Sequence, residues 1–408
     1  MKHDLLITGI SQLVTAEGAG PRRGRDMSAV KLVENAAIAV SSGRIAWTGR
    51  ESDWSGETAA KWDVSGHSVV PGLVDPHTHA VWAGDRLNDF EARTSGKSYE
   101  SILAAGGGIW SSIRSTAKAS HDELVALTKP RVESLIASGA TTIEIKSGYG
   151  FTSAAELVML EVIQSLSNIL PARMVPTLLI HVPPGELSER SAYIEEICRD
   201  LIPAVAKRKL AVAVDVFVEK EAWATAEAEC IFQAARQQGL AIKLHSDQFH
   251  SIGGVELGIS AGALSVDHLE AAGPEQIRQI AASSVIATIV PGVSLHLGIP
   301  AASGRQLIDA GAAVAVGTDL NPGSSPLFSA SAALALAVRL NGLTAKEALV
   351  AGTINAACAL GLSDRGRIEP GCVADFLVLD SGDWRDLVYT LGANPVREVW
   401  ISGQRIRA

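Results

Sequence analysis

Eight short apolar runs rich in β-branched residues recur along this chain from about residue 69 onward, and longer helix-like segments separate them. The runs are SVVPGLVD near Val70, TTIEIKSG at Thr141, MVPTLLIH at Met174, VAVDVFVE at Val212, AIKLHSDQ at Ala241, ALSVDHLE at Ala263, VIATIVPG at Val285 and AAVAVGTD at Ala312. This alternation predicts βα units around a parallel sheet, and eight strands is the number that closes a TIM barrel. We therefore predict an α/β fold built on a (β/α)8 barrel.

Helical segments and the two chain ends complete the predicted organisation. Helices are expected at 122–139, at 153–167, whose first residues fit an N-cap, and at 223–239, which ends at a glycine. Short strands joined by Gly and Ser turns are expected at 5–15, 36–49, 61–70, 372–380 and 396–406. The two ends would then join as one small β-sandwich-like domain, residues 1–68 and 366–408, beside a barrel domain spanning residues 69–365.

Composition narrows the class of protein further. A hydrophobic fraction of 47% with only 5% aromatic residues is typical of the aliphatic core of a parallel sheet covered by helices. Lys and Arg number 35 against 44 Asp and Glu, and no concentrated basic run is present, so nucleic acid is disfavoured as a partner. No segment resembles a signal peptide or a membrane span, so we expect a soluble cytoplasmic protein without a membrane partner. The four cysteines are widely spaced without a Cys-x-x-Cys pair, which favours free structural thiols: Cys198, Cys230, Cys358 and Cys372.

Histidines and one aspartate end four of the eight runs. His77 and His79 follow the first run two residues apart, a spacing that places both imidazoles on one face of an extended strand. His245, His268 and Asp319 end the fifth, sixth and eighth runs. Each alone fits a structural role, such as a core histidine or an Asx-turn aspartate. Together, at the strand ends where the active sites of barrels lie, they predict a metal site.

The donor set suits a mononuclear hydrolytic centre. Catalytic zinc sites use about three protein ligands and leave one position open for water. His77, His79 and His245 would be the ligands, with Asp319 as a fourth contact. A two-metal version would need a bridging group such as a modified lysine after the fourth run, where Glu219 and Lys220 stand; one metal is preferred.

Polar residues in the neighbouring loops are candidates for substrate binding. Arg86 follows the first strand and could hold a carboxylate bidentately, although a surface arginine paired with Asp85 or Asp89 is an equal alternative. Tyr149 lies between glycines after the second strand and His181 ends the third; packing roles are the alternative for both.

Two loops have distinctive compositions. NPGSSP, at 321–326, is rich in backbone donors and could hold an anion in a nest. AAGGGIW, at 104–110, lacks the strand, helix and acidic partner of a dinucleotide fingerprint, so we interpret it as a mobile loop or lid.

Longer stretches resemble a known group of enzymes. PGLVDPHTHA and GRIEPGCVADFLVLD resemble the metal-dependent amidohydrolase superfamily, over nearly the whole chain. The stretches HTHAVWAGDRLNDFEARTSGKSYESILAAGGGI, KSGYG, KLHSDQF, GALSVDHLE and TDLNPGSSP are similar, more narrowly, to members that hydrolyse 4-imidazolone-5-propanoate to N-formimidoyl-L-glutamate in histidine degradation. The resemblance implies a small-molecule substrate and one zinc or iron ion held by His77, His79, His245 and Asp319.

The resemblance also implies roles for further residues. The implied substrate contacts are Arg86, Tyr99, Tyr149, His181, Asn321, Gly323 and Ser324, and Gln248 joins His268 and Asp319 near the reacting groups. This chain departs from the group at two places: Ser324 replaces a usual Thr, and His181 is followed by VPPGE where His-Ala-x-Pro-Pro is common. The first change keeps the hydroxyl, whereas the second alters the residues that directly follow His181.

A mechanism follows from the chemistry of the ring. Its amide-like carbonyl is a poor electrophile, so the enzyme must supply hydroxide at neutral pH and stabilise a developing oxyanion. We expect a metal-bound hydroxide to attack this carbonyl while Asp319 takes or relays the proton. His268 would orient or deprotonate the water, or polarise the carbonyl; the sequence does not divide the proton roles among His268, Asp319 and Gln248.

Two alternatives remain at this stage. A related amidohydrolase could act on another cyclic amide or deaminate a heterocycle, although Arg86 favours a substrate with a carboxylate. A barrel that has lost catalysis could serve as a binding or scaffold protein, since fold does not guarantee activity, although every proposed ligand is retained. A homodimer would be unsurprising for such a barrel, but the sequence marks no interface.

Overall fold

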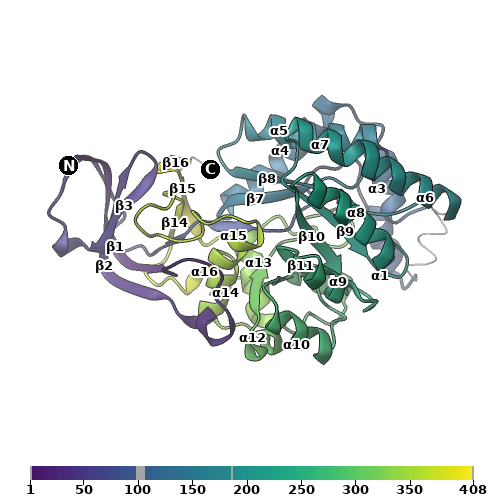
Figure 1. The fold of residues 1–408 in the computed structure, drawn as a ribbon. Helices are drawn as coiled ribbons and strands as arrows, with labels where there is room; N and C mark the ends of the chain where they lie inside the picture. Colours follow the sequence, from purple (N-terminus) through teal and green to yellow (C-terminus); the bar gives the residue numbers. More distant parts are fainter. Residues whose placement is uncertain (1, 98–105, 185–186, 407–408) are drawn as a thin grey trace.

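The computed structural model describes residues 2–97, 106–184 and 187–406, and two sheets organise this part of the chain (Figure 1). The strands of the barrel sheet are β6 (Leu73–Asp75), β7 (Ala140–Lys146), β8 (Arg173–Ile180), β9 (Ala213–Val218), β10 (Ala241–Ser246), β11 (Ser265–His268), β12 (Ile286–Ile289) and β13 (Ala313–Val316). They lie in chain order and every neighbouring pair is parallel. The predicted TIM barrel is therefore confirmed, and all eight predicted runs contribute a strand to it.

Helices cover the outside of the barrel. They are α1 (Leu87–Thr94), α3 (Ile109–Thr116), α4 (His121–Ala137), α5 (Ser153–Ser167), α6 (Leu187–Glu196), the π-helix η3 (Ile197–Leu201), α7 (Ile202–Arg208), α8 (Thr225–Gln237), α9 (Gly254–Ser260), α10 (Pro274–Ala282), α11 (Pro291–Leu297), α12 (Gly304–Ala310), α13 (Ala330–Leu340), α14 (Ala345–Ala351), α15 (Ile354–Ala359) and α16 (Asp386–Tyr389). Two short 3-10 turns are η1 (Gly24–Ser28) and η2 (Glu51–Asp53).

The three predicted helices correspond to α4, α5 and α8, and their ends have local causes. Ser120 forms a capping box with Glu123 at the start of α4, and Thr152 caps α5 one residue before its predicted start. Gly239 follows α8 with φ +73°, the left-handed conformation that glycine adopts easily after a helix. None of the helices in the described residues is long and apolar enough to cross a bilayer.

A second, mixed sheet joins the two ends of the chain, and we call it the small sheet because it belongs to the smaller predicted domain (Figure 1). Its strands are β1 (Lys2–Thr15), β2 (Lys31–Ser41), β3 (Arg44–Arg50), β4 (Glu57–Asp63), β5 (Val69–Pro71), β14 (Phe376–Leu379), β15 (Val396–Ile401) and β16 (Gln404–Ile406). The N-terminal and C-terminal halves meet where β14 pairs with β5. Its main core cluster is aliphatic and aromatic, with Ile7, Ile38, Phe376 and Trp400 among its members. The expected small β domain is present as a sheet, while the domain boundaries at residues 68 and 366 stay predictions.

The first predicted run forms two strands in place of one. Val69–Pro71 belongs to the small sheet as β5, whereas Leu73–Asp75 begins the barrel as β6. Gly72 lies between them, and a Cβ there would come within 2.4 Å of the Thr141 hydroxyl. The absence of a side chain lets the chain pass from one sheet to the other against β7.

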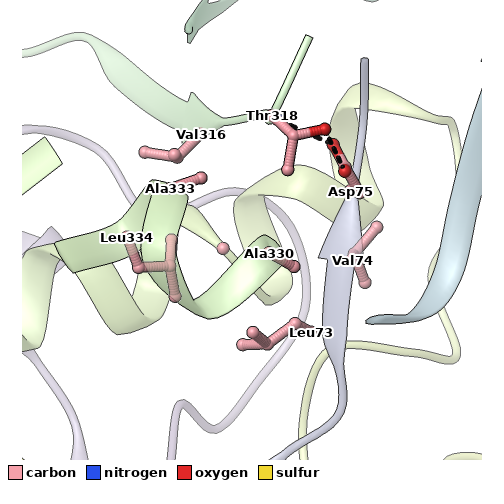
Figure 2. A pocket seen from close by; sticks show the side chains of 9 residues that line it. Leu73, Val74, Asp75, Val316, Thr318, Ala330, Ala333 and Leu334 are labelled. Carbon is pink, nitrogen blue, oxygen red and sulfur yellow. Dashed lines mark hydrogen bonds between the residues drawn. The ribbon is translucent and has the colours of Figure 1, made fainter. Parts of the chain in front are cut away.

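Side-chain bonds help to close the barrel between its first and last strands. The Asp75 carboxylate accepts hydrogen bonds from the Thr318 hydroxyl at 2.6 Å and the Thr318 amide at 3.0 Å (Figure 2). Thr78 and Leu320 form an isolated parallel bridge just beyond. A cavity of about 10 Å³ beside Asp75 is otherwise lined by apolar side chains of β6, β13 and α13 (Figure 2), and it is large enough for one water at most.

Candidate metal centre

Four donor atoms converge at the carboxyl ends of the barrel strands. The Nε2 atoms of His77 and His79 are 3.3 Å apart, and those of His79 and His245 are 3.4 Å apart. Asp319 Oδ1 lies 3.4 Å from His77 Nε2 and 3.1 Å from His79 Nε2. All four side chains are buried. The structure thus brings together the four residues that the sequence analysis selected as metal ligands.

The backbone around Asp319 explains how this convergence arises. The Asp319 amide donates to the carbonyl oxygen of His77 at 2.9 Å, and the His79 amide donates to Leu320 at the same distance. Asp319 adopts φ +51°, an uncommon conformation for aspartate that turns its side chain. Asn321 Nδ2 then donates to Asp319 Oδ2 at 2.9 Å. This bond occupies one carboxylate oxygen and leaves Oδ1 facing the imidazoles.

Two buried carboxylates orient two of the imidazole rings. Asp267 Oδ2 lies 2.7 Å from His77 Nδ1, and Asp215 Oδ1 lies 2.9 Å from His245 Nδ1. A carboxylate acceptor favours a proton on Nδ1, so the lone pair of each Nε2 is directed toward the centre. The Nδ1 of His79 has no such partner within the described residues.

Two lysines lie beneath the histidines and balance these carboxylates. Lys146 Nζ is 2.7 Å from Asp215 Oδ2 and 2.8 Å from Glu144 Oε2. Lys243 Nζ is 3.4 Å from Asp267 Oδ2, and it donates to the carbonyl oxygen of Pro76 at 3.2 Å. All five side chains are almost completely buried. We call Glu144, Lys146, Asp215, Lys243 and Asp267 the barrel-floor network.

Burial and the network set the protonation of the centre. Burial lowers the pKa of His79 and moves that of His245 well below its usual value, so both rings are neutral, as metal ligands must be. Burial and Lys146 also oppose charge on His77, but Asp267 and Asp319 prevail and raise its pKa to about 9. A cation that binds His77 must therefore displace a proton. Burial opposes ionisation of Asp319, yet contacts with His77 and His79 hold its pKa well below the usual range.

His268 ends β11, and Gln248 lies in the turn after β10. The ring of His268 is 5.3 Å from that of His77 and 5.1 Å from that of His245. Its backbone has φ +86°, an outlier for histidine, and its Nδ1 is 3.5 Å from Glu270 Oε2. Gln248 is buried, and in the described part of the chain it forms no hydrogen bond with the metal-site histidines.

Two predicted substrate contacts, His181 and Tyr149, lie beside the centre, and a third, Arg86, directly precedes α1. The His181 ring stacks on His79 with centroids 5.7 Å apart, and burial lowers the pKa of His181 to about 3. The buried Tyr149 ring is 5.6 Å from His181 and 6.2 Å from His79. Arg86 forms an ion pair with Asp89, one of the two alternatives considered for it, and also donates to the Ser112 hydroxyl at 3.4 Å. Gly323 lies against this guanidinium, since a Cβ there would be 3.2 Å from Arg86 Nη1.

The NPGSSP loop uses its donors internally. The amides of Gly323 and Ser324 both donate to Asn321 Oδ1 at 2.8 Å, and Asn321 Nδ2 donates to the Ser324 hydroxyl at 2.9 Å. The expected anion nest is therefore filled by the asparagine side chain. Tyr99 and the start of the glycine-rich loop at 104–110 lie outside the described residues.

The residues considered for a second metal have other contacts. Glu219 accepts hydrogen bonds from the amides of Phe249 and His250 at 2.9 and 3.1 Å, and it pairs with the His250 ring at 2.9 Å. Lys220 is exposed. Glu219 thus supports the turn that carries Gln248, and this geometry gives no support to a bridging ligand from that strand.

The barrel-floor network was missed in the sequence, although a signal was present. A charged residue inside an otherwise apolar barrel strand has no solvent to face, and the side-chain period of two places Lys243 on the same face as His245. Glu144 and Lys146 have the same relation in TTIEIKSG. Charged residues within such runs therefore indicate a polar barrel interior.

Comparisons with known proteins agree over the full chain. The model of the amidohydrolase family matches residues 68–406. The imidazolonepropionase of Deinococcus deserti is 59% identical over 404 residues, covering 99% of this chain and 100% of that protein. The imidazolonepropionase of Deinococcus radiodurans is 58% identical over 403 residues, with the same coverage. A crystal structure of an adenosine deaminase from Xanthomonas campestris with bound zinc is similar in fold, with a TM-score of 0.73 at 19% identity, covering 99% of this chain and 93% of that one.

Proposed function

Because this chain belongs to the amidohydrolase family, and within it to the imidazolonepropionases, we propose that its barrel centre hydrolyses 4-imidazolone-5-propanoate to N-formimidoyl-L-glutamate. The reaction opens a carbon–nitrogen bond of a cyclic amide in histidine degradation. The observation that carries the proposal is the convergence of three imidazoles and one carboxylate in a chain that aligns with these enzymes from end to end. The alternatives of another heterocycle and of a scaffold protein have no comparable support.

The donor set fits a zinc or iron ion held by His77, His79, His245 and Asp319. Metal–nitrogen bonds of about 2.0–2.1 Å place neighbouring ligands of a tetrahedron about 3.3 Å apart, close to the 3.1–3.4 Å that separates four neighbouring pairs of donor atoms among these residues. Asp319 Oδ1 is also a buried oxygen without a hydrogen-bond partner among the described residues. When bound, the ion would polarise the ring carbonyl and lower the pKa of water.

The chain's own residues would then manage the proton and the substrate. Asp319 Oδ1 takes a proton from the water that attacks the carbonyl carbon, since its low pKa keeps it ionised beforehand, and this proton passes to the ring nitrogen as the carbon–nitrogen bond breaks. His268 orients that water or stabilises the carbonyl oxygen from the other side, and Gln248 contributes at the same rim. Tyr149 and His181 bound the ring, and Arg86 holds the propanoate, with Tyr99, Asn321, Gly323 and Ser324 as further contacts.

The test is an ultraviolet assay of 4-imidazolone-5-propanoate, generated in place from urocanate, with metal-loaded and chelator-stripped protein. We expect metal-dependent loss of the ring chromophore and formation of N-formimidoyl-L-glutamate. Replacement of His268 by Ala should depress turnover far more than metal content. Stoichiometric metal without any turnover would contradict the substrate assignment.

Three finer points belong to the proposal. One ion per chain is expected, and elemental analysis of purified protein will identify it and count it. We expect the enzyme to act in the cytoplasm on a small molecule, without nucleic acid or membrane. A homodimer is expected for the assembly, and sedimentation of the purified protein tests it.

A further inference from the structure

A buried glutamate holds the turn that follows β7. Glu156, in the first turn of α5, accepts hydrogen bonds through Oε2 from the Gly148 amide at 2.7 Å. Through Oε1 it accepts from the amides of Gly150 at 2.7 Å and Phe151 at 3.0 Å. The Glu156 side chain is buried, so three backbone amides take the place of water as hydrogen-bond donors to its carboxylate. We call residues 147–151 the Tyr149 turn.

The backbone of the Tyr149 turn is confined on several sides. Phe151 adopts φ +63°, which is costly for an aromatic residue and needs support from its surroundings. Gly148 has φ +114°, and a Cβ on Gly150 would lie 2.5 Å from the Glu156 amide nitrogen. The turn therefore packs directly on the start of α5. Loss of the carboxylate would leave three donors unpaired in a buried place.

Tyr149 is the side chain that this turn presents to the centre. Its ring lies beside the stacked pair of His79 and His181, with centroids at 6.2 and 5.6 Å. Burial raises the pKa of its hydroxyl, and the charges of Asp319 and Arg86 shift this pKa in opposite directions. Tyr149 is part of the turn itself, so a small rotation of the turn would move its ring relative to His79, His181 and Arg86.

We infer that Glu156 is a positioning residue for substrate binding: it holds the Tyr149 turn so that the Tyr149 hydroxyl stays at the substrate side of the centre. This inference rests on the proposed function of Tyr149 as a substrate contact. In the described residues, Glu156 forms no hydrogen bond or ion pair with the four metal-site residues or with His268; its hydrogen bonds go to the Tyr149 turn. Its removal should therefore weaken substrate binding and leave the bond-breaking step almost unchanged.

The test compares Glu156→Gln with a matched control, Glu347→Gln. The control residue is also a buried glutamate in the first turn of a helix, where it accepts from the Thr344 amide at 2.8 Å. Glu347 lies on α14, and it pairs with Arg305. In E156Q the amide NH2 cannot accept, so we expect KM to rise at least tenfold while kcat stays within threefold. In E347Q the midpoint of thermal unfolding should fall while KM and metal content stay unchanged.

Further measurements separate a positioning role from a structural one. Combined with Tyr149→Phe, E156Q should add less than its own effect to KM, because both variants weaken the same contact. The affinity for the product N-formimidoyl-L-glutamate, measured by calorimetry, should fall by the same factor as KM rises. Glu156→Asp keeps the charge but shortens the reach, and it provides the same comparison if E156Q does not fold.

Each contrary result has a distinct meaning. An active E156Q with unchanged KM and product affinity overturns the inference. A joint loss of kcat and metal content also overturns it, because Glu156 would then support the whole rim. Wild-type protein without activity on the imidazolone would instead contradict the proposed function, on which the inference rests.

Discussion

The interior of the barrel beneath the histidines holds five charged side chains, whereas the main core cluster of the small sheet consists of aliphatic and aromatic residues. Both regions are equally inaccessible to water. In the small sheet Phe376 stacks on Trp400 with ring centroids 5.3 Å apart. The barrel interior beneath the histidines contains ion pairs instead, such as that of Lys146 with Asp215 at 2.7 Å.

The difference shows what each interior contributes. Apolar burial stabilises a fold without directing any group, while buried ion pairs cost desolvation and gain little net stability. The barrel-floor network has a directional task, since Asp267 and Asp215 aim two imidazoles and the lysines keep both carboxylates ionised. We therefore interpret the network as a support for the metal centre, and the small sheet as a source of stability that is separate from catalysis.

The largest effect is expected when a cation is removed from the barrel floor. Lys146→Met keeps the length of the side chain but leaves Asp215 and Glu144 without their shared cation. Breaking a buried network by removing one partner costs about 3–5 kcal/mol. Urea unfolding of chelator-treated protein measures this cost without the stabilisation that bound metal adds.

Metal-free protein is the proper state for that comparison, because loss of metal affinity would otherwise be counted as loss of stability. If Lys146→Met lowered the free energy of unfolding by less than about 1 kcal/mol, water or a bound proton would have to replace the missing cation beside the carboxylates. The proposed difference between the barrel interior and the core of the small sheet would then be wrong.

A smaller effect is expected from Asp215→Asn, which acts on the centre more than on the fold. The amide weakens the bond to His245 Nδ1 and the pairing with Lys146. Loss of such a supporting partner typically lowers metal affinity about 10- to 100-fold. Competition with a chromophoric chelator measures the affinity, and the exposed Asp200→Asn is a control that should leave it unchanged.

The outcome of Asp215→Asn also bears on the assignment of ligands. Unchanged metal affinity would indicate that His245 does not need this orientation, or that it does not bind the ion. A parallel measurement on Asp267→Asn makes the same test for His77.

In the small sheet, Phe376→Leu should cost about 1 kcal/mol of stability, because it exchanges one buried apolar side chain for a slightly smaller one. Metal affinity, KM and kcat should stay within twofold of wild type, since Phe376 belongs to the core of the small sheet and not to that of the barrel. Calorimetric unfolding and the ultraviolet assay check both parts. A large change in kcat would show that the small sheet positions the centre.

Much of this arrangement was accessible from the sequence. The positions of His77, His245 and Asp319 could be predicted from the ends of the apolar runs, because a polar residue that ends such a run lies at the rim of a barrel. The conformation of Asp319 could not be predicted, because its amide pairs with His77, more than 200 residues away in the chain. The bonds by which Asn321 fills the expected anion nest are local, since they join it to Gly323 and Ser324, but an asparagine before proline and glycine does not by itself say whether its oxygen or a ligand accepts from these amides.

The division of SVVPGLVD between two sheets is a second limit. Hydrophobic pattern predicts a strand, but it does not say which sheet receives each half. That depends on the contact of Gly72 with Thr141, which forms only in the folded chain. In the same way, Glu156 resembles any polar residue near the start of a helix until the Tyr149 turn packs on it.

The smallest effect is expected for an ion pair of the same chemistry at the surface. Lys129 pairs with Glu133 on α4, but both side chains are nearly half exposed, so water already solvates each charge. Lys129→Ala should change stability by no more than about 0.5 kcal/mol, because such pairs are weak and alanine favours the helix. The effect should diminish further in high salt, whereas the cost of Lys146→Met should persist there, because ions do not reach the barrel floor. If urea unfolding instead gave similar losses of stability for Lys129→Ala and Lys146→Met, burial would not be what distinguishes the barrel interior. The orienting role of the charges in the barrel-floor network would then have to be explained by their geometry alone.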